Sequence, residues 1–196
     1  MKYSTKLFLI TIASLFIVLQ TSLVSSTVEV PVLNQLKFLQ KILLTEKQLS
    51  VSKEKEIEVG IIYQSDNRNS RKTFEDIMFH SGSTPVKVGD KTLKFIPIDL
   101  KNSKDIANII SNKNNNIVIF IITQLRNFDY RQIKKYALDN SILTYTTNAD
   151  IMENYNFSLS VTYINNTMRP LINTSEVKSE GYNFPASIFQ FAKPTK

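Results

Sequence analysis

One pattern repeats along the chain: a short apolar run, then a polar turn, then a stretch with apolar residues every three or four positions. The first apolar run is residues 57–63, and the most apolar run is 117–122. Runs of this length suit buried strands, whereas the wider spacing is typical of helices that cover a sheet. Strands that alternate with helices are joined by crossovers and lie mainly parallel. The pattern predicts an α/β fold, a single three-layer domain with a mainly parallel sheet and helices on both faces.

The expected elements follow from this pattern. The most apolar run should form the centre of the sheet, because such a strand is buried on both faces. The expected strands are 57–63, 93–98, 117–122 and 142–145. The expected helices are 32–44, one that Ser70 caps, one that Ser103 caps, and one that Asp129 and Gln132 open as a capping box.

The end of the chain departs from the alternation. Two apolar segments, 159–164 and 168–172, are separated by Asn165-Asn166-Thr167. Because asparagine tolerates the left-handed backbone of a tight turn, these segments are expected to form a β-hairpin. Asn173 then opens a short helix that Gly181 ends, and the apolar tail 188–191 is expected to pair at the edge of the sheet.

The start of the chain has the order of a secretory signal. Lys2 and Lys6 precede the apolar run 7–19, and small residues lead up to Ser26. The run is shorter than the roughly 20 apolar residues that cross a bilayer. We therefore expect a cleaved signal peptide at 1–26, export to the periplasm and one domain at 27–196; the alternative is an uncleaved N-terminal anchor.

The composition excludes several kinds of chemistry. The chain has no cysteine and one histidine, His80, so thiolate zinc sites, cysteine nucleophiles and sites with two histidines are excluded. It also has no glycine-rich phosphate loop and no Gly-x-Ser-x-Gly elbow. We expect neither a catalytic centre nor a cofactor or metal.

The formal net charge of +7 leaves three classes of partner open: nucleic acid, anionic lipid and an acidic protein. The lysines are scattered, and no aromatic residues alternate with a basic stripe, so nucleic acid is not expected. An acidic partner or a membrane surface fits better, and a homodimer is left open.

Polar loops follow three of the expected strands. In an open parallel sheet, ligands bind beyond the carboxyl ends of the strands, and the loop 64–70 also precedes a helix N-terminus, which suits an anion. An arginine from these loops, Arg68 or Arg126, would pair with an anionic group. Polar turns also follow strands that bind nothing. The candidate ligand- or partner-binding residues are Gln64, Ser65, Asn67, Arg68, Ser70, Thr123, Gln124, Arg126 and Asn148.

Three stretches resemble the YfiR-like family of bacterial periplasmic proteins. The first is the helical segment 37–49, which leads into 57–64 and the polar turn Asn67-Arg68-Asn69-Ser70; the second is 117–123. The third is the closing pattern, with a strand ending at 172, Asn173, a short helix before Gly181, and the segment 186–192. The chain departs from the family in lacking cysteines and in having asparagine and lysine where the family has a glycine-rich middle.

The resemblance implies a regulatory role. The family's best-known member represses an inner-membrane diguanylate cyclase by binding its periplasmic sensor domain. We therefore expect a non-enzymatic periplasmic regulator that binds the sensor domain of an inner-membrane signalling protein, a diguanylate cyclase or a histidine kinase, and modulates its output. The alternative is a periplasmic protein that binds a small anion through the three loops. A hydrolase ranks last, because no nucleophile and base stand out together.

Overall fold

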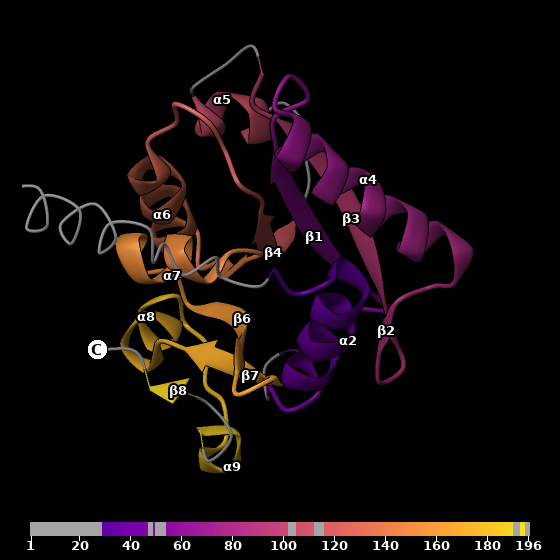
Figure 1. Ribbon diagram of the computed structural model, residues 1–196, viewed down its shortest axis with the longest axis vertical. Coiled ribbons are helices and arrows are strands. Elements are labelled where there is room, and N and C mark those ends of the chain that lie inside the picture. Colours follow the sequence, from indigo (N-terminus) through magenta and orange to yellow (C-terminus); the bar gives the residue numbers. More distant parts are fainter. Residues whose placement is uncertain are drawn as a thin grey trace, which may run out of the picture.

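The computed structural model describes residues 29–46, 49, 54–101, 105–111, 116–189 and 193–194. The expected signal peptide, the Ser103 cap and the turn at 112–115 lie outside these residues. In the described part of the chain, eight strands form one sheet in the order β2-β3-β1-β4-β5-β6-β7-β8 (Figure 1). The strands are β1 (Glu56–Tyr63), β2 (Lys87–Val88), β3 (Lys91–Asp99), β4 (Ile117–Ile122), β5 (Leu143–Thr146), β6 (Leu159–Ile164), β7 (Thr167–Ile172) and β8 (Lys193–Pro194).

The sheet is mainly parallel, as predicted. The run from β3 through β1, β4 and β5 to β6 pairs in parallel, as does β7 with β8, whereas β2 with β3 and β6 with β7 pair antiparallel. The helices that join the strands are α2 (Val32–Leu43), α4 (Arg68–Ser83), α5 (Ile106–Ser111), α6 (Tyr130–Asp139), α7 (Ala149–Tyr155), α8 (Thr174–Ser179) and α9 (Ala186–Phe189).

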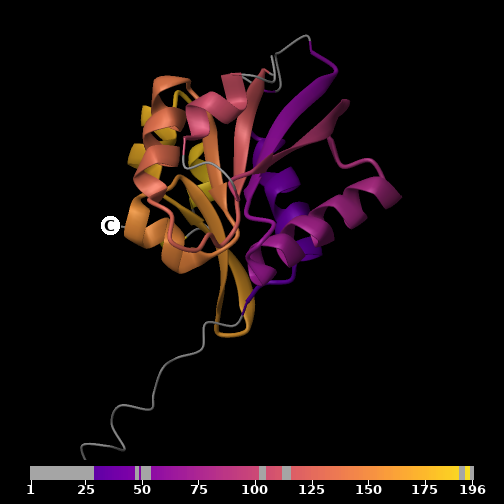
Figure 2. The ribbon, with the colours of Figure 1, turned by 90° about the horizontal axis from the view of Figure 1, so that it is seen from above.

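Two hydrophobic cores lie on opposite faces of the sheet. Alternate residues of β1 divide between them: Val59 and Ile61 pack with α2 and α4, and Ile62 packs with α5, α6 and α7. Figure 2 shows α2 and α4 on one side of the strands and α5, α6 and α7 on the other. The protein is therefore a three-layer α/β domain, and β4, which is almost wholly buried, lies inside the sheet as its apolar sequence predicts.

The prediction that Ser70 caps a helix was wrong. The helix α4 begins at Arg68, and the Asn67 side chain caps it by accepting the backbone N–H groups of Asn69 at 3.1 Å and Ser70 at 3.5 Å. Both residue types cap helices well. The difference arises because Ser70 is fully buried and its hydroxyl hydrogen-bonds to Thr123 at the end of β4.

The apolar tail also differs from its prediction. Residues 188 and 189 belong to the short helix α9, which follows Pro185, and the edge pairing is made by β8 against β7. The short edge strand β2 and the helix α7 were not foreseen. Asn148 caps α7 by accepting the N–H of Ile151 at 3.1 Å, so a cap signal was present there.

The predicted hairpin is confirmed. β6 and β7 pair antiparallel, and the turn residues Asn165 and Asn166 have φ values of 49° and 58°. This left-handed pair is the geometry for which asparagine was expected. Asn173 caps α8, and Gly181 has a φ of 89°, as its predicted place at a helix end requires.

A buried carboxylate anchors the end of α8 to the sheet. Glu180 is wholly buried, accepts hydrogen bonds from the backbone and hydroxyl of Thr144 and from the Ser158 hydroxyl, and pairs with Lys134 at 2.8 Å. Its charge is therefore compensated, as a buried charge requires. The cluster holds helix and sheet together, and the buried position of Glu180 gives it a structural role.

Candidate functional site

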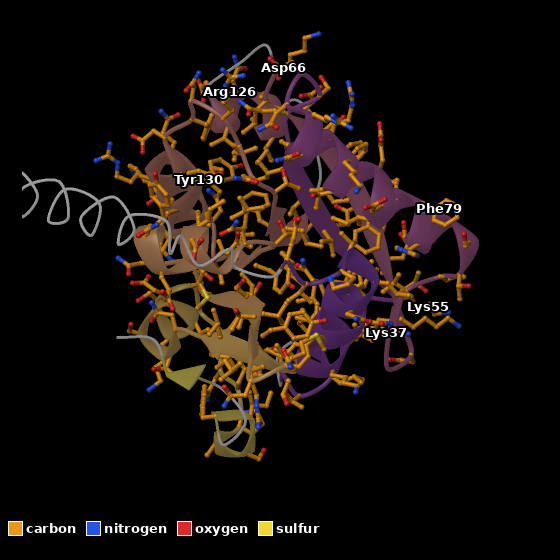
Figure 3. All side chains as sticks on the ribbon, in the orientation of Figure 1. Lys37, Lys55, Asp66, Phe79, Arg126 and Tyr130 are labelled. Carbon is orange, nitrogen blue, oxygen red and sulfur yellow. The ribbon has the colours of Figure 1, made fainter. Side chains whose placement is uncertain are left out.

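The loops after β1 and β4 lie side by side and are joined by reciprocal hydrogen bonds. The Gln64 side chain donates to the Arg126 carbonyl at 3.1 Å and accepts the Arg126 backbone N–H at 2.6 Å. The Asn67 amide donates to the Gln124 carbonyl at 3.0 Å. We call residues 64–70 and 123–126 the carboxyl-edge ridge; Figure 3 shows two of its residues, Asp66 and Arg126, together at the top of the molecule.

A chain of hydroxyl groups fixes the ridge from beneath. The Thr123 hydroxyl donates its single proton to the Ile62 carbonyl at 3.0 Å, so the Ser70 hydroxyl must donate to Thr123, 2.6 Å away. Ser70 in turn accepts the backbone N–H of Gln64 at 2.8 Å. Because Ser70 and Thr123 are fully buried, these bonds tie the first turn of α4 to the carboxyl end of β4.

The third polar loop reaches the same edge beside a hollow of about 300 Å³. Asn148 lines this hollow together with Thr147 and with Gln124 of the ridge. The carboxylate-bearing residues Glu29 and Asp150 also line it. Ligand pockets typically measure about 300–1,000 Å³, so the hollow has room for a small polar molecule.

The structure therefore brings most of the predicted residues together. Gln64, Asn67, Ser70, Thr123 and the backbone of Arg126 form the hydrogen-bonded ridge, and Gln124 and Asn148 meet at the hollow. The remaining residues are placed differently. Ser65 is turned toward β3, where its N–H donates to Asp99 at 3.1 Å, and Arg68 is exposed at the start of α4. Neither arginine lines the hollow.

Sequence reasoning missed Asp99, which ends β3 at the same edge. It accepts the backbone N–H groups of Ser65 and of Lys101, the latter at 2.9 Å. Partial burial raises the pKa of Asp99, but hydrogen bonds from the Ser65 hydroxyl and from these backbone groups outweigh that effect and leave the pKa below its usual value. The signal was available, since Asp99 directly follows the predicted strand 93–98. Asp150 follows the candidate residue Asn148 by two positions, so its place near this edge could also be read from the sequence, whereas no comparable signal marked Glu29.

The described residues outside this edge of the sheet show no cluster of catalytic or metal-binding side chains. His80 lies near the end of α4 with its ring against Phe79, as a helix-end histidine would. Across the described ranges, no group of three or more histidine and carboxylate side chains could hold a metal ion. Within the same ranges, no helix is long and apolar enough to span a bilayer.

No family model matches the chain. No curated protein matches it either, so membership of the YfiR-like family stays a prediction. Ten chains of solved structures do match. One is an ABC domain in complex with L-Trp from Streptococcus pneumonia, with a TM-score of 0.58, 12% sequence identity and coverage of 84% of this chain. The chain spans 60% of the length of that structure. At this identity the likeness shows a common α/β fold and no more.

Proposed function

We propose that the protein is a non-enzymatic regulator of the bacterial periplasm that binds the sensor domain of an inner-membrane signalling protein through the carboxyl-edge ridge. The observation that carries the proposal is the mutual hydrogen bonding of the two ridge loops. The side-chain amides of one loop hydrogen-bond to the backbone of the other, and the two buried hydroxyls hydrogen-bond to each other. These bonds hold the loop backbones in one arrangement.

A surface held in this way suits recognition of a protein. Loops that are ordered before binding lose less conformational entropy on binding, so more of the contact energy remains as affinity. The ridge also exposes one acid and two bases, Asp66, Arg68 and Arg126, and charges of both signs specify the orientation of a partner. Regulation then requires only that the sensor domain has different affinity in its two signalling states.

The test is to capture partners from the native envelope with the tagged full chain and with an Arg68→Glu/Arg126→Glu variant. We expect the wild-type chain to retain a membrane protein with a periplasmic sensor domain, and the variant to lose it. Both arginine side chains are exposed, so the variant should fold normally, which circular dichroism can check.

The same variant should reproduce the signalling phenotype of a gene deletion, measured as cyclic di-GMP level or as kinase output. If the variant binds and regulates like the wild type, the ridge is not the contact surface. If a deletion leaves both outputs unchanged, the regulatory role itself is wrong.

The hollow favours a second candidate, a small-molecule binding protein. Two carboxylates, Glu29 and Asp150, line the hollow, whereas Arg68 and Arg126 do not. A ligand there would carry an amine or neutral polar groups, and an anion would instead be held by the arginines on the ridge. One solved structure of similar fold is a complex with L-Trp, which makes amino acids the first probes.

Thermal melting with a panel of amino acids tests this candidate, because a ligand that binds only the native state raises the melting temperature. We expect any shift to be lost in Gln124→Ala and Asp150→Ala, whose side chains are exposed. A shift that survives both substitutions would place the ligand elsewhere.

A further inference from the structure

Exposed apolar side chains are concentrated on α2, its C-cap and α4. Across the described ranges, four large hydrophobic side chains are exposed, and three of them belong to α2, its C-cap and α4: Leu33 at 39%, Leu44 at 52% and Phe79 at 71%. Isolated exposed leucines need no explanation. A phenylalanine at this exposure, on a helix that packs beside α2, suggests that the face contacts something apolar.

The outer side of α2 combines these side chains with positive charge. Leu33, Lys37, Lys41 and Leu44 follow at spacings of four, four and three residues, which places them in one stripe along the helix. All four are exposed, while Leu39 on the inner side is completely buried. The helix contains no acidic residue, so the stripe has two cations between two leucines.

The opposite side of the molecule offers an internal comparison. Arg131, Lys135 and Leu138 on α6 have the same spacing as Lys37, Lys41 and Leu44. Both α6 cations are paired with acids, Arg131 with Asp129 at 2.8 Å and Lys135 with Asp139 at 2.6 Å. In the part of the chain that the structure describes, neither Lys37 nor Lys41 makes a salt bridge. The α2 stripe therefore keeps its charge, whereas the α6 stripe is neutralised.

Neighbouring elements extend the positive surface. The Gln40 side chain donates to the Lys87 carbonyl at 2.9 Å, which brings β2 to α2, and Lys72 of α4 lines one cavity with Leu33. Acids reduce this charge in part: Glu75 pairs with Arg71 at 3.7 Å, and both Asp76 and Glu29 line the same cavity as Lys72. Figure 3 shows Phe79, Lys37 and Lys55 on the right of the molecule, apart from Asp66 and Arg126 at the top.

We propose that this surface, the α2/α4 face, docks on an anionic lipid bilayer. Lysines surrounding protruding leucine and phenylalanine side chains are the chemistry of interfacial binding, in which the cations meet lipid phosphates and the apolar groups enter the acyl boundary. An acidic protein partner fits less well, because lysine is depleted at protein interfaces. Docking through this face would leave the ridge free for the partner of the proposed function, on which this inference does not depend.

Vesicle co-sedimentation tests the proposal with the chain as it is recovered from expressing cells, its N-terminus established by mass spectrometry. We expect binding to phosphatidylcholine vesicles that contain phosphatidylglycerol, weak binding to phosphatidylcholine alone, and loss of binding at high salt. Lys37→Gln/Lys41→Gln should weaken binding about 25-fold, since each lysine near an anionic surface contributes about fivefold. Phe79→Ser should also weaken it.

The matched control is Arg131→Gln/Lys135→Gln, which removes the same charge at the same spacing from α6 and should leave vesicle binding unchanged. Equal weakening by both double variants would show that the net charge of the protein governs vesicle binding. It would overturn the assignment of the binding surface to the α2/α4 face. Equal binding to both kinds of vesicle, or binding to neither, would overturn the lipid proposal. Capture of an acidic protein that the α2 variant alone loses, without vesicle binding, would assign the face to a protein instead.

Discussion

Gly60, in the middle of β1, shows how tightly the sheet is packed at a single residue. A Cβ atom at this position would lie 2.7 Å from Ile98 Cδ1 and 3.0 Å from Phe120 Cδ1. Both neighbours belong to adjacent strands and are completely buried, so neither can move into open space. The glycine is therefore required by close approach of side chains and not by its backbone conformation.

Gly60→Ala should lower the free energy of unfolding by about 1–3 kcal/mol, the usual cost of overpacking a core. Urea denaturation measures the change. Gly82→Ala is the matched control, because a Cβ at Gly82 in α4 meets nothing within 4 Å. A helical alanine should leave stability equal or higher by about 0.5–1 kcal/mol. Equal stability of Gly60→Ala and the wild type would mean that the neighbours repack freely.

At the scale of elements, a buried glutamine joins α2 to the sheet and to the start of the described chain. The Gln35 side chain accepts the Tyr145 hydroxyl at 2.9 Å and donates to the carbonyls of Val30 at 2.7 Å and Thr147 at 3.3 Å. It therefore connects α2 to β5 and to the loop beside the hollow. Such a residue is polar within an apolar helix face, where the spacing of leucines alone would predict another apolar side chain.

Gln35→Leu should cost about 1–3 kcal/mol of unfolding free energy, because it leaves the buried Tyr145 hydroxyl without a partner. Adding Tyr145→Phe removes that hydroxyl and should recover part of the loss. Urea denaturation of the wild type, both single variants and the double variant gives the coupling energy. Strictly additive effects would indicate that the Gln35–Tyr145 hydrogen bond does not contribute.

For the whole molecule, buried tyrosines limit stability at alkaline pH. The pKa of Tyr130 is raised from 10.0 to about 12, mainly because the side chain is buried, and its hydrogen bond with Leu125 offsets part of this rise. Burial also raises the pKa of Tyr145 and of Tyr182. Above pH 10 the unfolded chain loses protons that the folded chain retains, so the contribution of these groups to stability is complete below pH 10 and falls as the pH rises.

We expect the free energy of unfolding to decrease between pH 10 and pH 12, with Tyr130 contributing a slope of at most about 1.4 kcal/mol per pH unit. Tyr130→Phe should make the decrease shallower. Urea denaturation at a series of pH values, with tyrosinate absorbance of the folded protein, measures both effects. A slope that Tyr130→Phe leaves unchanged would show that Tyr130 is not among the groups responsible.

The candidate site could be predicted in composition but not in arrangement. The rule that polar residues gather at the carboxyl ends of parallel strands correctly placed Gln64, Gln124 and Asn148 on one edge. It could not foresee that Gln64 binds the backbone of Arg126, or that Ser70 faces β4 instead of capping its own helix. Those bonds join residues more than fifty positions apart, and nothing local in the chain encodes them.

The sequence by itself determined the α/β class, the parallel centre of the sheet, the hairpin at Asn165-Asn166 and the helix end at Gly181. These features depend on periodicity and on backbone preferences that act within a few residues. Only the tertiary structure decided which polar groups of the ridge are already satisfied and that the hollow is lined by Glu29 and Asp150. It also decided that, among the described residues, the α6 cations form salt bridges whereas Lys37 and Lys41 form none. Hydrogen bonds and charge compensation depend on distances across the fold, which the spacing of residues along the chain does not specify.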